Sequence, residues 1–185
     1  MPQPTAPSWY TPFYCEENVW RLLRDNPDGA TQGHAVFISN AQRACPVWQQ
    51  RAAPHPSEPV LWDYHVVMLG RDAGTRWLVW DLDTTQVCPM PALDYLDGAF
   101  PHAAALQDAW QPQFRLVPHA ALQEHFASDR SHMLTPDGGF THPPPPEPPI
   151  QPPGHTMNLF SFVDVTAPFV GTVLSLPALR AWLAE

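Results

Sequence analysis

Apolar and polar residues follow one another in a pattern that predicts a first helix, several strands and a closing helix. After Cys15, apolar residues at 19, 20, 22 and 23 form a one-sided helical stripe, with Glu16 and Glu17 in the first turn. Asn-Pro-Asp-Gly at 26–29 gives this helix a stop signal. We therefore expect a helix that begins at Cys15.

Apolar runs in the middle of the chain predict buried strands over 34–40, about 60–69, 76–82 and 114–118, with a loop at 70–75. The remaining pattern predicts partial helix over 92–110, a short helix over 119–127 and an amphipathic helix over 175–185. Pro177 falls in the first turn of that last helix, where proline is tolerated. Because short loops join consecutive strands, we expect an α/β (α+β) fold with an antiparallel sheet flanked by helices.

Two proline-rich segments interrupt the pattern. Residues 1–13 carry four prolines and are predicted to be an irregular arm, and residues 142–154 must be extended, polyproline-like chain. At 185 residues, the chain is expected to be a single domain over 1–185.

Composition excludes several classes of protein. The formal net charge is −9 and all nine basic residues are Arg, which argues against a nucleic-acid partner because phosphates need a basic face. No apolar run approaches the roughly 20 residues of a membrane helix, and the first residues lack a secretory signal pattern. Three cysteines without CxxC spacing favour a reducing compartment, so we expect a cytoplasmic protein.

One histidine and one aspartate are predicted to meet across two of the strands. If 60–69 and 76–82 form an antiparallel hairpin around the loop 70–75, the numbers of facing residues add up to about 145. His65 and Asp81 add up to 146, which places their Cβ atoms roughly 4.5–5.5 Å apart. The carboxylate could accept the imidazole Nδ1–H, fix the tautomer and stabilise the imidazolium.

Alternation along the strands extends this pair to a polar patch. Asp63 shares the face of His65, and Asp83 shares that of Asp81. Five flanking residues are expected to point the other way, into a core: Trp62, Tyr64, Val66, Trp80 and Leu82. The competing interpretation is a buried histidine that merely has its hydrogen bonds satisfied.

Cys15 supplies a third element for nucleophilic chemistry. It lies at the start of the first helix, where free backbone N–H groups and the helix dipole favour a thiolate, unless Glu16 or Glu17 turns toward the sulfur. A cysteine at a helix N-terminus facing a His–Asp pair is the arrangement of cysteine acyl-transfer enzymes. The alternative for Cys15 is a small apolar filler. Cys45 and Cys88 are not at a helix end.

A metal site is not expected. His119, His125 and His132 are six and seven residues apart, which does not place all three on one helical face.

Seven short motifs occur in order along the chain: YCEENVW (14–20), AVFISN (35–40), WDYHVV (62–67), DLDT (81–84), FASDRSHM (126–133), PPPP (143–146) and MNL (157–159). Together they resemble the protein N-terminal glutamine amidohydrolase family, from about residue 10 to the C-terminal helix. The resemblance implies an α-β-α sandwich akin to the transglutaminase and papain-like folds. It also implies a monomeric, cofactor-free cysteine hydrolase that deamidates N-terminal glutamine of proteins or peptides, a step toward N-end-rule degradation, with the nucleus as a second compartment in a eukaryote.

The family's nucleophile, histidine and aspartate fall on Cys15, His65 and Asp81, the residues that the hairpin and the helix end select. Phe13 stands where some family members carry a second cysteine, which the chemistry does not need. The proline run lies at the same place in the family, which favours a packed strap over a ligand for a proline-binding domain.

Recognition of a terminal glutamine requires a carboxylate for its free α-ammonium. The candidates are Glu16, Glu17, Asp63 and Asp129, with Asp63 first because it shares the catalytic face and Glu16 next because it adjoins the nucleophile. Tyr64 is a further substrate-binding candidate. Asp129 could instead pair with Arg130, and Ser128 and His132 could line the pocket or only cap a turn.

Three other classes remain open from the sequence. A cysteine protease would need a cleft open on both sides of the scissile bond, and a transglutaminase-like transferase would need an amine acceptor site. The third is a binding module in which the triad survives without turnover.

Overall fold

The structure of the chain, a computed structural model, describes residues 7–25, 33–72 and 76–185. The Asn-Pro-Asp-Gly stop at 26–29, the end of the 70–75 loop and the first six residues of the arm lie outside the described residues. The α-helices are α1 (Cys15–Asp25), α3 (Ala92–Ala99), α4 (His119–His125), α5 (Leu159–Val163) and α6 (Leu176–Leu183). The strands are β1 (His34–Ser39), β2 (Cys45–Val47), β3 (Val60–Trp62), β4 (His65–Arg71), β5 (Trp77–Trp80), β6 (Met90–Pro91), β7 (Gln113–Pro118) and β8 (Thr172–Ser175).

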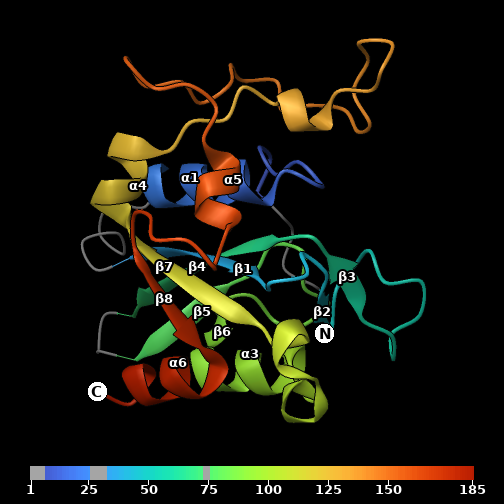
Figure 1. Cartoon of the computed structure of the whole chain (residues 1–185), viewed down its shortest axis with the longest axis vertical. Coiled ribbons are helices and arrows are strands. Elements are labelled where there is room, and N and C mark those ends of the chain that lie inside the picture. The colour runs from blue at the N-terminus through green and yellow to red at the C-terminus, as the bar shows by residue number, and fades with distance from the viewer. Residues whose placement is uncertain (1–6, 26–32, 73–75) are drawn as a thin grey trace.

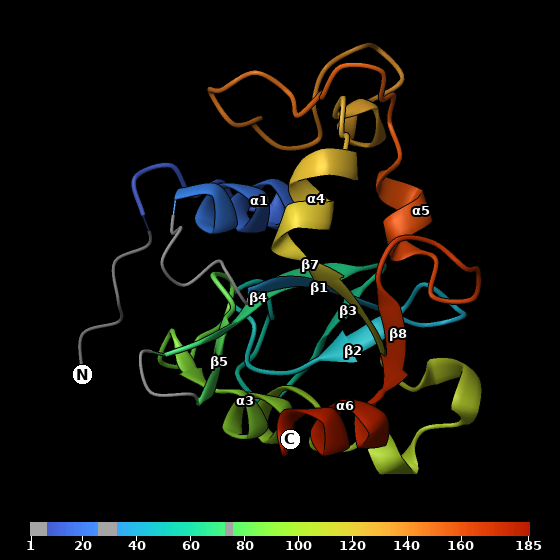
Figure 2. The same cartoon turned by 90° about the vertical axis from the view of Figure 1, so that its left-hand side faces the viewer.

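Six strands form one antiparallel sheet in the order β6-β5-β4-β1-β7-β8, and β2 pairs with β3 in a separate ribbon. Helices α1, α4 and α5 cover one face of the sheet, and α3 and α6 cover the other (Figure 1; the same layers are seen from the side in Figure 2). The expected fold class, an antiparallel sheet between helical layers, is confirmed. Among the described residues, no helix is both long and apolar enough to cross a membrane.

Each face of the sheet contributes to its own core because side chains alternate along the strands. In β4, Val67 and Leu69 pack into the core under α3 and α6, whereas Val66 and Met68 pack into the core under α1, α4 and α5. His65 shares the odd numbering of the first set, so its face is opposite that of α1. His65 can nevertheless come near Cys15 of α1, because it is the first residue of β4 and lies at the end of the strand.

The predicted strand over 60–69 is two strands, and its register differs from the prediction. β3 ends at Trp62 and pairs with β2, and β4 begins again at His65. Met68 faces Trp80, so facing residue numbers add up to 148 rather than about 145. Asp81 consequently follows β5 instead of lying within a strand.

Helix α1 begins at Cys15 as predicted, but its burial is not confined to one apolar stripe. Val19 and Leu23 are buried in the core, whereas Trp20 is only partly buried. Glu17 and Arg21 are also buried, on the side where the proline-rich segment crosses the helix. This second covering explains why the simple amphipathic pattern was incomplete.

The other expected elements lie close to their predicted places, namely β1, β7, α3, α4 and α6. The Ser175 hydroxyl caps α6 by accepting the Ala178 N–H at 3.3 Å, with Pro177 in the first turn as expected. The prediction missed β2, β6, α5 and β8, which are short and lack a clear period.

The proline-rich segment 142–154 is held against α1 by polar contacts. The Arg130 guanidinium donates to the backbone carbonyls of Pro145 at 3.1 Å and Glu147 at 2.8 Å. The Ser128 N–H donates to the Ile150 carbonyl at 2.8 Å. Figure 1 shows this orange segment on the outer side of α1 and α5.

Candidate active site

A pocket of about 250 Å³ opens where β4 begins and α1 begins. Ligand pockets are typically about 300–1,000 Å³, so this one suits a single side chain with a short length of backbone. Its lining consists of Phe13, Cys15, Trp62, Asp63, Tyr64, His65, Asp83, His132, Met133, Thr141, His142 and Phe160. Cys15 and His65 therefore face the same small space.

His65 and Asp81 form the predicted buried pair. The imidazole Nε2 lies 2.9 Å from Asp81 Oδ1, and both side chains are 1% exposed. The sequence argument assigned the carboxylate to Nδ1, and the structure corrects this to Nε2. The contact forms despite the shifted register because Asp81 lies just past the end of β5. Its side chain is therefore not restricted to one face of the sheet and can contact His65 at the start of β4. Nδ1 is thus the nitrogen left for the pocket.

Asp81 accepts hydrogen bonds from three further groups. Gln50 Nε2 and the Tyr95 hydroxyl donate to Oδ2 at 2.8 and 3.1 Å, and the Asp83 backbone N–H donates to Oδ1 at 2.9 Å. Burial alone would raise the pKa of the Asp81 carboxyl, but His65 and these donors lower it below its usual value. The carboxylate is therefore held as an anion whose orientation is fixed.

The His65 ring is held from its face as well as its edge. Trp62 stacks on it with ring centroids 5.7 Å apart and an interplanar angle of 14°. The Trp62 indole N–H donates to Gln50 Oε1 at 3.3 Å, so one glutamine orients both Trp62 and Asp81. Burial favours the neutral imidazole, but the Asp81 carboxylate outweighs it and raises the pKa of His65.

A tight turn before α1 positions Cys15. The Asn18 side chain accepts from the Thr11 N–H at 3.0 Å and donates to the Thr11 carbonyl at 2.7 Å. Phe13, between them, has φ of 68°, a left-handed conformation that is uncommon for a residue other than glycine. Tyr14 is fully buried and its hydroxyl donates to the His142 carbonyl at 3.0 Å. The start of the helix is therefore fixed on both sides of the cysteine.

The Cys15 sulfur lies at the start of β4, where the backbone N–H of Val66 hydrogen-bonds to it. Its thiol donates to Glu16 Oε2 at 3.7 Å. Burial, followed by the Glu16 and Asp83 charges, raises the pKa of the thiol well above its usual value, although the Val66 N–H lowers it. Burial and the nearby glutamate therefore favour the neutral thiol over the thiolate that the helix end alone would favour.

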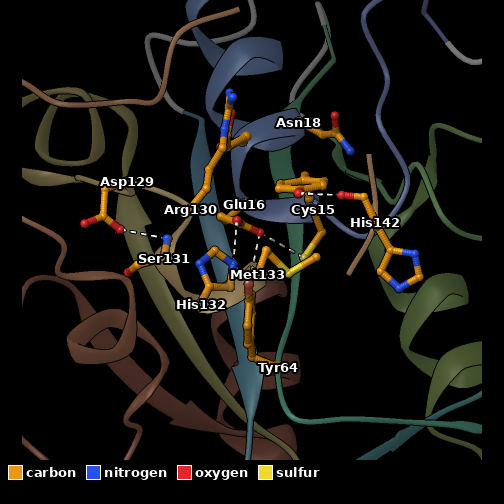
Figure 3. A network of polar contacts seen from close by, with 12 residues as sticks. Cys15, Glu16, Asn18, Tyr64, Asp129, Arg130, Ser131, His132, Met133 and His142 are labelled. Atoms are coloured by element: carbon orange, nitrogen blue, oxygen red, sulfur yellow. Dashed lines mark hydrogen bonds and ion pairs between the residues drawn. The ribbon is translucent and has the colours of Figure 1, made fainter. Parts of the chain in front are cut away.

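Glu16 is the centre of a polar group beside the sulfur (Figure 3). Its Oε2 also accepts the Tyr64 hydroxyl at 3.1 Å, and His132 Nε2 lies 3.5 Å from its Oε1. Glu16 is 2% exposed and Oε1 has no hydrogen-bond partner. Glu16 does not itself line the pocket, but its carboxylate contacts Cys15, Tyr64 and His132, all of which do.

The other predicted acids are placed differently. Glu17 is buried in ion pairs with Arg21 and Arg130 and does not line the pocket. Asp63 lines the rim, 57% exposed, with its carboxylate 3.5 Å from the Arg43 guanidinium.

Residues 128 and 129 lie outside the pocket lining. Asp129 is exposed and accepts the Ser131 N–H at 2.9 Å, apart from the group around Glu16 (Figure 3). The pairing of Asp129 with Arg130 that the sequence allowed is not formed, because Arg130 binds Glu17 at 2.6 Å. Ser128 is fully buried, and its backbone bonds to the proline-rich segment.

Asp83 lines the pocket with His65, although it lies in the turn after β5 and not on a strand as the predicted alternation required. Its Oδ1 accepts a hydrogen bond from the Tyr10 hydroxyl. Burial raises the pKa of the Asp83 carboxyl, against the opposing charge of His65. Tyr10 thus joins the N-terminal arm to the edge of the pocket.

Within the described parts of the chain, His65, Asp81 and Asp83 are the one group whose ligand atoms lie close enough to hold a metal, within 4.8 Å of one another. Nε2 of His65 and both Asp81 oxygens already take part in hydrogen bonds to protein groups. A cation would have to replace them, so this donor set does not fit a dedicated metal site. His119, His125 and His132 form no such group.

Sequence reasoning missed the residues that surround the pair. Gln50, Tyr95 and Tyr10 come from separate segments and carry no periodic signal, so nothing in the sequence indicated them. Trp62 was assigned to the opposite face because β3 and β4 were taken as one strand, whereas Tyr64, Val66 and Trp80 do pack on the face away from His65.

One family of known proteins matches nearly the whole chain. A family model described as N-terminal glutamine amidase matches residues 10–182. A Bos taurus protein named protein N-terminal glutamine amidohydrolase is 38% identical over 174 residues, covering 91% of this chain and 83% of the relative. Relatives of the same name from Homo sapiens and Drosophila willistoni are 39% and 38% identical, each over 162 residues, with 84% and 85% of this chain and 78% and 79% of the relatives covered.

Proposed function

The chain belongs to the N-terminal glutamine amidase family, and on this premise we propose that it hydrolyses the side-chain amide of an N-terminal glutamine to give N-terminal glutamate and ammonia. The observation that carries the proposal is the placement of Cys15 and His65 in one small pocket, with His65 fixed by a fully hydrogen-bonded Asp81.

In the first half of the reaction, the Cys15 thiol transfers its proton to His65 Nδ1 and the sulfur attacks the amide carbon. Asp81 stabilises the resulting imidazolium through Nε2. Backbone N–H groups at a helix start lack partners within the helix, so the Cys15 N–H is available to the developing oxyanion. The imidazolium then protonates the amide nitrogen, the C–N bond breaks and ammonia leaves a thioester on Cys15.

In the second half, neutral His65 takes a proton from a water molecule, which attacks the thioester carbon. The C–S bond breaks, the sulfur recovers a proton from the imidazolium, and the γ-carboxylic acid that is released gives its remaining proton to solvent to become the carboxylate. No step requires a metal or an organic cofactor.

Selectivity for a terminal residue is proposed to come from Glu16. Its Oε1 lacks a hydrogen-bond partner in a buried position, where an unpaired acceptor is costly and a cation would be strongly bound. Asp63, the first choice from the sequence, is mostly exposed and already near Arg43, so its attraction for an ammonium is screened. We therefore assign binding of the α-ammonium to Glu16, whose carboxylate is oriented by Tyr64. Asp63 lies at the rim of the pocket and does not bind this group.

The pocket also favours the amidase over a cysteine protease. Phe13 and His142 stack with ring centroids 3.7 Å apart and both line the pocket, which supports a wall where a protease would need room for the chain before the scissile bond.

Matched peptides test this proposal. Peptides that begin with Gln, begin with Asn or begin with acetyl-Gln are incubated with the protein, and ammonia and peptide mass are measured. Ammonia from the first peptide alone is expected, and Cys15→Ala should abolish it with little change in the unfolding transition. Backbone cleavage, cross-linked product or full activity of Cys15→Ala would each overturn the proposal.

By family resemblance, we further propose that a monomeric enzyme acts on proteins with N-terminal glutamine in the cytoplasm, or also in the nucleus of a eukaryote, as a step of the N-end-rule pathway. The test is the half-life of a reporter with N-terminal glutamine in cells with and without active enzyme.

A further inference from the structure

One acceptor in the pocket wall has no part in the mechanism above. Asp83 lies beside His65 and lines the pocket, and its Oδ1 is bound by the Tyr10 hydroxyl. Its Oδ2 accepts no hydrogen bond from any residue that the structure describes. The Asp83 carboxylate, the His65 ring and the Asp81 carboxylate present atoms within 4.8 Å of one another. The Asp83 carboxylate, one oxygen of which is bound by Tyr10, therefore lies beside the imidazole that handles the leaving nitrogen.

Substrate and product differ only in the group that ends the side chain, and this group must lie close to the Asp83 carboxylate. A glutamine side chain ends in an NH2 group with two donors, whereas the glutamate product ends in a carboxylate that only accepts. The amide nitrogen has to face His65, because the imidazolium protonates it. Asp83 borders the same place, so it would meet a donor in the substrate and a like charge in the product.

We propose that Asp83 is a specificity-determining residue that accepts a hydrogen bond from the amide NH2 of the substrate and repels the γ-carboxylate of the product. This inference rests on the proposed function. Asp83 takes part in no covalent step, and its role is to hold the leaving nitrogen toward His65 and to expel the glutamate. Sites built to pair with a substrate N–H reject analogues that lack it, because a polar group is then left unpaired.

The competing explanation is that Asp83 only anchors the arm through Tyr10. The two roles separate in a pair of variants. Asp83→Asn keeps an oxygen for the Tyr10 hydroxyl but removes the charge and adds a donor, whereas Tyr10→Phe removes the anchor and keeps the charge.

The experiment measures binding in the Cys15→Ala background, where no turnover occurs, by titrating peptides that begin with Gln or with Glu and are otherwise identical. We expect the Gln peptide to bind at least about tenfold more tightly than the Glu peptide. Adding Asp83→Asn should remove or reverse this preference, whereas adding Tyr10→Phe should change it less than about twofold. Asp83→Ala, which should also lose the preference, serves if the Asn variant does not fold.

Two results would overturn the inference: an unchanged Gln-over-Glu preference in the Asp83 variants, or an equal loss of preference in Tyr10→Phe. Failure of the proposed function would be seen separately, as absence of ammonia from the wild-type protein. Because the titration requires no turnover, it decides the role of Asp83 in either case.

Discussion

Glu16 and Glu17 are neighbours in sequence and both are buried, yet they lie in opposite electrostatic environments. Both oxygens of Glu17 receive arginine: Arg130 Nε at 2.6 Å, and Arg130 Nη2 and Arg21 Nη2 each at 2.8 Å. Glu16 has no arginine within 4 Å among the described residues, and its partners are a thiol, a tyrosine hydroxyl and the more distant His132.

The difference indicates two uses of a buried carboxylate. A carboxylate whose charge is matched inside the protein holds structure together, and here Glu17 joins α1 through Arg130 to the proline-rich segment. A carboxylate left without a cation is unfavourable unless a ligand supplies one. We take Glu16 to be of this second kind, and the following changes separate the two.

The largest effect on stability is expected from Glu17→Gln. Removing one partner of a buried ion pair leaves uncompensated charge, here mainly on Arg130 because Arg21 keeps Glu147 at 3.6 Å, and costs about 3–5 kcal/mol of unfolding free energy. The lower end is expected because Arg130 keeps two backbone carbonyls. Urea unfolding measures it, and specific activity of the folded protein should change little.

Asp25→Asn is the matched control. It removes an arginine partner at the other end of α1, where both side chains of the pair are nearly half exposed, and should cost less than about 1 kcal/mol. Equal losses for Glu17→Gln and Asp25→Asn would show that burial of the pair contributes nothing.

Glu16→Gln should reverse this outcome. Loss of a charged hydrogen bond to the α-ammonium is worth about 1.5–3 kcal/mol, so kcat/KM for a Gln peptide should fall roughly 10- to 150-fold. The unfolding free energy should stay the same or rise, because a buried acceptor without a partner is removed. A strong loss of stability with unchanged kcat/KM would place Glu16 in the same class as Glu17.

Asp81 sharpens the comparison because it is fully paired and yet lies in the site. Its partner His65 has a pKa raised above its usual value, so in Asp81→Asn the imidazole pKa should fall, which NMR titration of the Cys15→Ala protein would measure. An unchanged imidazole pKa would remove Asp81 as the cause.

The same pair makes stability depend on pH. The pKa of Asp81 is lowered on folding, so the carboxylate stabilises the fold above pH 3.8. This stabilisation is lost as the pH falls through the lower pKa of the folded state. The pKa of His65 is raised on folding, so the imidazolium stabilises the fold fully below pH 6.5. This stabilisation is lost as the pH rises through the higher pKa of the folded state. The stability difference between wild type and Asp81→Asn should therefore be greatest at about pH 5–6 and should decrease once the pH rises above the raised pKa of His65.

The smallest effect is expected from Asp63→Asn. The exposed pair with Arg43 is screened by solvent, so KM for the Gln peptide should rise no more than about fivefold, and the rise should shrink in high salt. If Asp63→Asn lowered kcat/KM as much as Glu16→Gln does, Asp63 at the rim would be the residue that binds the α-ammonium.

The sequence predicted the residues of the site better than the details of their contacts. Cys15 at a helix start follows from periodicity, and the predicted hairpin paired His65 with Asp81 although its assumed register was wrong. Family resemblance selects the same triad. The register, the Nε2 contact and the position of Trp62 did not follow, because a two-residue break between β3 and β4 resets the strand alternation. Periodicity also could not tell Glu16 from Glu17, because their difference comes from Arg130, more than a hundred residues away.

The most direct test of the account is a crystal structure of Cys15→Ala with a bound peptide that begins with Gln. We predict the α-nitrogen within about 3 Å of the Glu16 carboxylate, and the side-chain amide between position 15 and His65 with its nitrogen toward Asp83. A peptide whose α-nitrogen instead lies at Asp63 or in solvent, with Glu16 still unpaired, would contradict it.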